Sequence, residues 1–249
     1  MIGAKPVGNG SIEELKITTK GVSMITQWSY SRLSCFEKCP KQAEFKFIKK
    51  IKEPGSPAMD RGKDIHKMCE EFIRGQLEEI PAQIQDFEDA FVVLQQLYLH
   101  GHVICESDWA ITKEWEKTGW FEDDTWGRAK VDAFVYEEGT SKEARVIDFK
   151  TGRYDGNQEV HKEQCELYGA IALKRYPELE SITTEMWYLD HGKIDRYIYT
   201  PESIKVKQER LNLRAIAMTT AEEFPANPSK FKCKWCYFGK QNMCREAEV

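Results

Sequence analysis

The chain has 249 residues, of which 41% are hydrophobic, so it is long enough to bury a substantial core in one or two domains. Its formal net charge of −5 argues against indiscriminate binding to nucleic acid, although a local basic patch is compatible with that charge. No stretch approaches the roughly 18 consecutive apolar residues of a membrane span, and the first residues lack the apolar run of a signal peptide. We therefore expect a cytoplasmic protein without a membrane partner.

The N-terminal part predicts an extension followed by a short helix. Residues 1–24 lack firm periodicity and are expected to form an extension or a peripheral strand. A helix should begin at the capping serines Ser29 and Ser31. Pro40 should break this helix near Cys39, because proline lacks the amide hydrogen that a helix interior needs.

The rest of the chain alternates helical and period-two patterns. The expected elements are helices over 61–76 and about 84–99, strands over 109–115, 126–136 and 144–149, a helix over about 160–175, strands over 182–190 and 194–199, and a helix over about 202–223. A cysteine-rich segment over 225–249 ends the chain. This order predicts one α/β domain over 25–249, with a mixed central sheet flanked by helices.

The segment "VIDFKTG" (146–152) predicts a buried strand that carries a carboxylate and an ammonium near its end. Asp148 and Lys150 are two residues apart, so both side chains point to the same face. If the preceding hairpin turns symmetrically about Gly139 and Thr140, Asp132 lies directly opposite Asp148. Two carboxylates that close repel each other unless a cation lies between them, and hard oxygen ligands suit Mg²⁺ or Mn²⁺. The alternative is an ordinary strand with one solvated face.

Three further polar residues have weaker patterns. His66 lies at the polar edge of its predicted helix, where a histidine is more often a surface or core residue than a ligand. Gln164 and Tyr168 are one turn apart on the helix after "DFKTG" and therefore share a face. Glu114, on the strand before "GRAKVD", is a candidate for a supporting position behind the metal ligands.

The eight cysteines are expected to include a metal site, because disulfide frameworks are rare in the cytosol. Cys233, Cys236 and Cys244 provide three thiolates, and the fourth ligand would be Cys39 or Cys35. Four thiolates bind either zinc or an iron–sulfur cluster. The other cysteines stand in apolar patterns and are expected in the core: Cys69, Cys105 and Cys165.

Two lysine-rich segments, 38–52 and 230–245, each contain cysteines. A charge run is usually a solvated face, but a cluster that uses Cys39 would bring the two segments together into one basic surface.

Taken together, these motifs resemble the PD-(D/E)XK nuclease superfamily, and specifically its RecB-like branch with a C-terminal iron–sulfur cluster. The resemblance extends from about Ser29 to Cys244. It rests on "SYSRLSCFEKCP", "GKDIH", "GRAKVD", "IDFKTG" and "QCELY", followed in the branch's usual order by the cysteine cluster. One spacing differs, because the seven residues between Cys236 and Cys244 form a longer gap than in much of the branch.

The resemblance implies a restriction-endonuclease-like fold whose N- and C-terminal segments are joined by the metal cluster, and it implies roles for individual residues. Lys150 would be the catalytic lysine, and Gln164 and Tyr168 would position the DNA and the active site. The implied ligands of Mg²⁺ or Mn²⁺ are His66, Asp132, Asp148 and the backbone carbonyl of Phe149. The implied ligands of a [4Fe-4S] cluster, with zinc as the alternative metal, are Cys39, Cys233, Cys236 and Cys244.

The implied activity is that of a metal-dependent DNA exonuclease in recombination, repair or replication, in a bacterium or a phage-infected host cell. Its DNA substrate would be single-stranded or a duplex end. Phosphate contacts and base stacking on the lysine-rich surface would guide the strand, and the residues implied for this role are Lys49, Lys50, Lys232, Lys234 and Trp235. An accompanying single-strand annealing protein or helicase is expected, since the chain has no P-loop of its own. The alternatives are a CRISPR adaptation nuclease that acts with an integrase, and a catalytically silent DNA-binding module.

Overall fold

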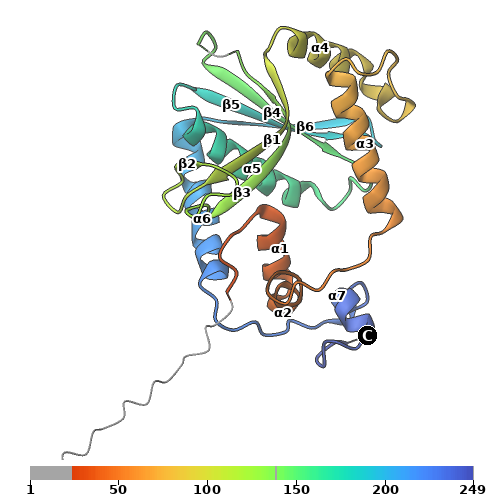
Figure 1. Cartoon of the computed structure of the whole chain (residues 1–249), viewed down its shortest axis with the longest axis vertical. Coiled ribbons are helices and arrows are strands. Elements are labelled where there is room, and N and C mark those ends of the chain that lie inside the picture. The colour runs from red at the N-terminus through yellow and green to blue at the C-terminus, as the bar shows by residue number, and fades with distance from the viewer. Residues whose placement is uncertain (1–23, 138, 249) are drawn as a thin grey trace, which may run out of the picture.

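A computed structural model describes residues 24–137 and 139–248 (Figure 1). Apart from Met24, the predicted N-terminal extension lies outside the described residues. In the described part of the chain, no helix is both long enough and apolar enough to cross a membrane.

The centre of the structure is a mixed six-stranded sheet in the order β2-β1-β3-β4-β5-β6 (Figure 1). Strands β4 and β5 are parallel and the other neighbouring pairs are antiparallel. The parallel pair needs a crossover, which helix α5 supplies. The strands are β1 (Val103–Ile111), β2 (Lys117–Thr118), β3 (Gly127–Val135), β4 (Glu143–Lys150), β5 (Ser181–Tyr188) and β6 (Lys193–Tyr199).

Helices pack on both faces of this sheet, so it has two hydrophobic cores. Helices α3 (Pro57–Ile73) and α4 (Glu88–Leu99), with the 3₁₀ helix η2 (Ala82–Phe87), cover one face. Helices α1 (Tyr30–Lys38), α5 (Gln158–Arg175) and α6 (Pro201–Thr219) cover the other. The predicted α/β fold with a mixed central sheet flanked by helices is therefore confirmed.

The first helix begins and ends where the sequence predicts. Ser29 caps α1 by accepting a hydrogen bond from the backbone amide of Arg32, and Cys39 is its C-cap. Pro40 then begins the short helix α2 (Pro40–Ala43), which continues into the π-helical turn η1 (Glu44–Ile48). Proline fits the first turn of a helix, where its missing amide hydrogen has no partner to lose.

One predicted strand is wrong. The chain is extended over β1, which ends at Ile111, whereas the sequence predicts a strand over 109–115. The long C-terminal helix α6 also ends at Thr219, before the predicted end at 223. The strand correction has a functional consequence, because it changes which acidic residue of this segment lies in the sheet.

The cysteine-rich segment packs against α2 and η1 through direct contacts. It contains two short helices, α7 (Lys230–Cys233) and α8 (Tyr237–Lys240). Phe238 is fully buried and stacks on Phe45 with ring centroids 4.9 Å apart. The backbone amide of Lys41 donates to the carbonyl of Pro225 at 3.2 Å. Segments far apart in the sequence are thus held side by side by aromatic packing and backbone hydrogen bonds.

Candidate active site

The predicted register of the β3–β4 hairpin is confirmed. Its pairs include Ala133 with Ile147, and the same register one residue further places Asp132 opposite Asp148. At this level the side chain of Asp132 takes part in the bonding between the strands, because its Oδ2 accepts the backbone amide of Phe149 at 2.7 Å. The two aspartates, both buried, therefore lie where the hairpin pairing ends.

Asp148 is held by residues from the strand and from α5. Its Oδ1 accepts the hydroxyl of Tyr168 at 2.7 Å and the amide of Gln164 at 3.3 Å. Its Oδ2 lies 2.5 Å from Nζ of Lys150. Apart from this ion pair, the buried Oδ2 has no hydrogen-bond partner in the described part of the chain. A buried carboxylate oxygen with unused lone pairs is the type of group that a hard cation binds.

Lys150 and Gln164 contact each other as well as Asp148. The ammonium of Lys150 donates to Oε1 of Gln164 at 2.9 Å, and Nε2 of Gln164 also donates to the hydroxyl of Tyr168 at 2.6 Å. Burial, followed by the charge of Asp148, raises the pKa of Tyr168 well above its usual value. The phenol therefore stays protonated near neutral pH and acts as a hydrogen-bond donor to the carboxylate.

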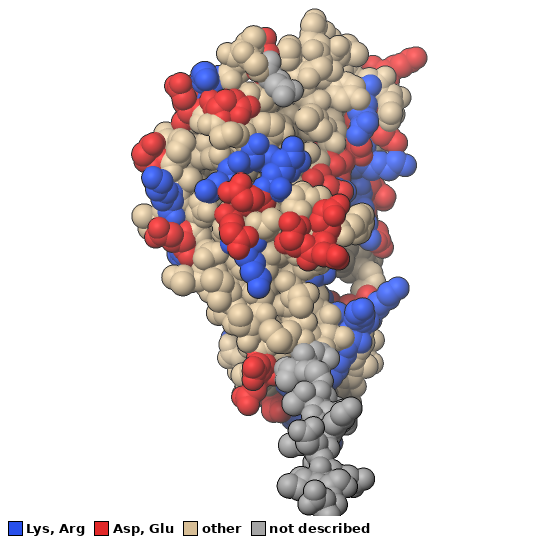
Figure 2. All heavy atoms as spheres, turned by 60° about the vertical axis from the view of Figure 1, so that its left-hand side comes forward, with Lys and Arg blue, Asp and Glu red and all other residues tan. Residues whose placement is uncertain are grey.

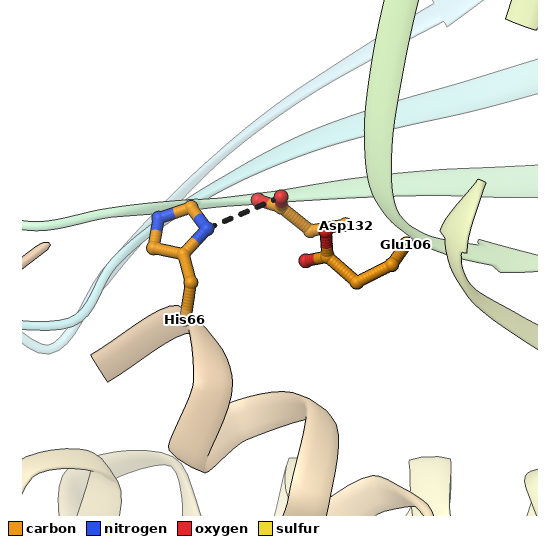
Figure 3. A group of neighbouring side chains, drawn as sticks. All are labelled: His66, Glu106 and Asp132. Atoms are coloured by element: carbon orange, nitrogen blue, oxygen red, sulfur yellow. Dashed lines mark hydrogen bonds and ion pairs between the residues drawn. The ribbon is translucent and has the colours of Figure 1, made fainter. Parts of the chain in front are cut away.

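Asp132 faces the imidazole of His66 on α3 (Figure 3). Nδ1 of His66 lies 3.2 Å from Oδ1 of Asp132. Burial and the nearby charge of Asp148 raise the pKa of Asp132, against the opposing effects of His66 and the Phe149 amide. Burial alone lowers the pKa of His66, but the hydrogen bond and charge of Asp132 outweigh it and raise that pKa. The pair shares a proton or a cation more readily than either residue would alone.

Besides Asp132 and Asp148, a third carboxylate, that of Glu106, lies beside the pair of His66 and Asp132 (Figure 3). The potential ligand atoms of His66, Glu106 and Asp132 all lie within 4.8 Å of one another. The carboxylate of Glu106 also pairs with Nζ of Lys130 at 2.6 Å. Two carboxylates and an imidazole at this separation are a suitable set of ligands for Mn²⁺ or another divalent cation.

The sequence reading missed Glu106 and offered Glu114 instead. Glu114 lies beyond the end of β1, in a depression lined by α6 residues, and is not on a strand. Glu106 lies on β1 between residues that pair with the two neighbours of Asp132, so Glu106, Asp132 and Asp148 occupy one level across three strands. The same register, continued from β3 to β1, would have identified Glu106. The sequence, however, predicted a strand only from residue 109, so Glu106 lay outside it.

At the level of Glu106 and Asp132, the regular alternation of side chains between the two faces of the sheet is interrupted. Cys105 packs in the α3/α4 core and Trp109 in the α5/α6 core, although strict alternation would put both side chains on the same face. Between them Glu106 adopts a left-handed conformation with φ 54°, which is uncommon for a residue other than glycine. Strand β3 shows the same change of facing around Asp132. This irregularity turns both acids toward His66.

Helix α3 is fixed to the loop that follows β4. Arg61 on α3 makes two hydrogen bonds to Asp190, at 2.9 and 2.6 Å. The same carboxylate accepts the backbone amide of Gly152 at 2.6 Å. Gly152 has φ +85°, which favours glycine there. This network holds the helix that carries His66 against the strand end that carries Lys150.

His161 is a second residue that the sequence reading missed. It lies one turn before Gln164 on α5, and its Nδ1 is 3.0 Å from the hydroxyl of Tyr188. Burial and the charge of Lys150 lower its pKa, so it is neutral near pH 7. Residues three apart share one face of a helix, so the spacing between His161 and Gln164 could have indicated that His161 lies near the site.

The four predicted cluster cysteines meet at one place. Cys39, Cys233, Cys236 and Cys244 line a single cavity of ≈ 30 Å³ between α2 and the C-terminal segment. Cys35 packs instead against the hydrophobic core, so Cys39 is the better candidate for the fourth ligand. The prediction that the remaining three cysteines lie in the core is confirmed: Cys69, Cys105 and Cys165 are buried.

The predicted DNA-binding lysines differ in their surroundings. Lys49 pairs with Glu44 at 2.9 Å and lies over the ring of Phe45, so its charge is partly compensated. Lys50 makes no ion pair with the described residues. Trp235 is 67% exposed, and Lys234 lies over its ring at 5.4 Å.

The lysine-rich segments are brought together, but they form no uniform basic surface. Lys38, Lys41 and Lys232 line the same cavity as the cluster cysteines. Lys41 and Lys46, however, pair with Glu44 and Glu53. On the face drawn in Figure 2, basic and acidic side chains are also intermixed.

Comparisons with known proteins place this geometry in a family. Residues 27–245 match the family model described as the PD-(D/E)XK nuclease superfamily. Among solved structures, the chain is similar to a candidate exonuclease from Eubacterium rectale, with 13% identity, a TM-score of 0.52 and 97% of each chain covered. It is also similar to SSO0001, with 15% identity, a TM-score of 0.46 and 92% of this chain and 91% of that chain covered. No curated protein matches the chain.

Proposed function

Because the chain belongs to the PD-(D/E)XK nuclease superfamily, we propose that it is a metal-dependent DNA exonuclease that hydrolyses phosphodiester bonds. The observation that carries this proposal is the buried ion pair of Asp148 with Lys150, opposite Asp132. A buried pair of this kind is costly to maintain for stability alone. It is useful where a cation and a phosphate have to be held together.

The proposed ligands of the catalytic metal are His66, Asp132, Asp148 and the backbone carbonyl of Phe149, with Glu106 as a further carboxylate. The unused lone pairs of Asp148 Oδ2 support this assignment. When bound, Mg²⁺ or Mn²⁺ neutralises charge on a phosphate oxygen and lowers the pKa of a bound water. The imidazole nitrogen favours Mn²⁺ over Mg²⁺, which prefers oxygen ligands alone.

Lys150 is the proposed catalytic residue. Its ammonium is oriented by Asp148 and by Oε1 of Gln164, which leaves one of its three N–H donors for a substrate oxygen. There it stabilises the extra negative charge of the transition state or orients the attacking water. Tyr168 and Gln164 act as positioning residues, since each holds Asp148 through a hydrogen bond.

We further propose that Cys39, Cys233, Cys236 and Cys244 hold a [4Fe-4S] cluster, with zinc as the alternative. Their shared cavity supports a common metal group held by the four thiolates. The group would add covalent restraint to a contact that aromatic packing already makes. Iron, acid-labile sulfide and zinc analysis of protein purified without oxygen distinguishes the two.

The proposed DNA surface comprises Lys50, Lys232, Lys234 and Trp235, with Lys49 in a lesser role because of its pairing with Glu44. We place the activity in recombination, repair or replication in the cytoplasm. A single-strand annealing protein or helicase is the expected partner, and an integrase would indicate CRISPR adaptation instead. Co-purification from the native host separates these partners.

The deciding experiment uses end-labelled linear single- and double-stranded DNA with Mg²⁺, Mn²⁺ or EDTA. Wild-type protein is expected to shorten the DNA from one end only when metal is present. Lys150→Ala and Asp148→Ala should be inactive while melting as cooperatively as the wild type. DNA that is bound but left uncut under every metal condition would overturn the proposed activity and favour a DNA-binding module.

A further inference from the structure

A second cavity adjoins the candidate active site on the α5 side of the sheet. It has a volume of ≈ 390 Å³ and is lined by the start of α1, the loop before β3, the beginning of β3 and the middle of α5. Figure 1 shows α1 below β3 and α5. Gln164 and Tyr168 line this cavity and also bind Asp148, so the cavity and the catalytic carboxylate share a wall.

Two arginines in this cavity lack acidic partners. Arg32 of α1 and Arg128 of β3 are half-buried, and neither makes an ion pair with the residues that the structure describes. Burial and the charge of Arg128 both lower the pKa of Arg32, which shows that the two like charges act on each other. Six other arginines do have carboxylate partners: Arg61, Arg74, Arg145, Arg196, Arg210 and Arg214. Arg153, Arg175 and Arg245 also make no ion pair with the described residues, but they do not line this cavity.

Neutral groups hold both guanidinium groups in place. Arg32 donates to the carbonyl of Gln27 at 3.1 Å and lies 5.2 Å from the ring centroid of Phe47. Arg128 donates to the carbonyl of Trp120 and lies 5.0 Å from the centroid of that ring. Its buried Nε has no hydrogen-bond partner in the described structure. The positive charge is thus fixed in position while remaining uncompensated, which is the arrangement that an entering anion stabilises.

The remaining polar groups of the cavity also favour an anion. The hydroxyls of Ser29 and Ser31 lie at the N-terminus of α1, where the helix dipole is positive and the first turn carries no acid. Lys130 also lines the cavity, but its ammonium pairs with Glu106. No acidic residue lines the cavity. The arginines and serines together can contact several oxygens of one phosphate.

We propose that the Arg32–Arg128 cavity binds a backbone phosphate of single-stranded DNA, next to the phosphodiester that lies at Asp148 and Lys150. This inference rests on the proposed nuclease function. The cavity is recessed and Asp148 is buried, so a strand that reaches both has to leave a duplex. Bidentate guanidinium groups are well suited to phosphate oxygens, whereas a lysine acts as a point charge.

The test is DNA binding without cleavage. Fluorescence anisotropy in EDTA would measure the affinity of a labelled 15-nucleotide single strand as a function of salt. Each lost phosphate contact lowers the slope of log affinity against log salt by about 0.7 for single strands, so Arg32→Gln/Arg128→Gln, which removes the contact to this one phosphate, should lose about 0.7 and bind about fivefold more weakly at 0.1 M salt. The control Arg74→Gln removes an equal charge that Glu70 already compensates, and should change neither quantity. If the double variant does not fold, Arg32→Gln alone should lower the slope and the affinity in the same direction, by up to the same amounts.

Three further comparisons make the inference falsifiable. Bis(4-nitrophenyl) phosphate with Mn²⁺ reaches only the active site, so the double variant should hydrolyse it at the wild-type rate. A wild type that cleaves neither this diester nor DNA refutes the nuclease function, whereas an unchanged salt slope in the double variant refutes the cavity. A loss confined to duplex DNA, or to strands with a 5′-phosphate, would overturn the assignment to a backbone phosphate of a single strand.

Discussion

Tyr168→Phe removes one hydroxyl group from the candidate active site. The ring of Tyr168 is 3% exposed and packs in the α5/α6 core, and phenylalanine preserves that packing. The substitution removes only the hydroxyl, which donates to Oδ1 of Asp148 at 2.7 Å and accepts from Gln164. In the variant, Asp148 retains its ion pair with Lys150 at 2.5 Å and its longer hydrogen bond from Gln164 at 3.3 Å.

The expected loss follows from the strength of a hydrogen bond to a charged group, about 1.5–3 kcal/mol. Since about 1.4 kcal/mol corresponds to a factor of ten in rate, kcat/KM should fall by roughly 10- to 150-fold. The fall should be smaller than for Lys150→Ala, because Tyr168 acts through Asp148 and touches no reacting atom.

The assay is nucleotide release from end-labelled single-stranded DNA at saturating Mn²⁺, together with thermal melting. Tyr176→Phe is the matched control, because Tyr176 ends the same helix and its hydroxyl makes no hydrogen bond to the described residues. A Tyr168→Phe protein with wild-type melting and activity within twofold of wild type would refute the view that this hydroxyl orients Asp148.

Three other substitutions test separate parts of the structure. Glu106→Gln should weaken Mn²⁺ binding in calorimetry by about tenfold, whereas Glu114→Gln should not; equal effects would contradict the choice of Glu106. Asp190→Asn should lower the free energy of unfolding at pH 7 by about 0.5–1 kcal/mol, because an arginine and a backbone amide hold the pKa of Asp190 below its usual 3.8 and solvent screens this half-exposed pair. A carboxyl whose pKa is depressed in the folded state stabilises that state at pH values above its unfolded pKa, and this stabilisation is lost as the pH falls. Urea titrations should therefore show that the difference in unfolding free energy between wild type and variant shrinks below about pH 4. A difference that stays constant with pH would contradict this role of Asp190. Phe238→Ala should cost about 3–5 kcal/mol of local stability and speed proteolysis of the C-terminal segment, whereas Trp235→Ala, at an exposed position, should resemble wild type.

The sequence alone was sufficient for the features that depend on local chemistry. Ser29 and Pro40 predicted the bounds of the first helix, because capping and the missing proline amide act within a few residues. The hairpin register followed from its turn, since strand pairing has a period of two and a short connection fixes the partners. That register was enough to predict that Asp132 lies opposite Asp148.

Only the tertiary structure decided what approaches this hairpin from elsewhere. Glu106 was missed because the start of β1 depends on its pairing with β3, and no local signal marks where such pairing begins. The cavity between Arg32 and Arg128 joins two residues 96 positions apart, which no periodicity can connect. For the same reason the sequence did not reveal that Glu44 partly compensates the charge of Lys49, since this pairing depends on the geometry of the π-helical turn. Local bonding thus determined the catalytic strand, and long-range packing determined which acids and bases surround it.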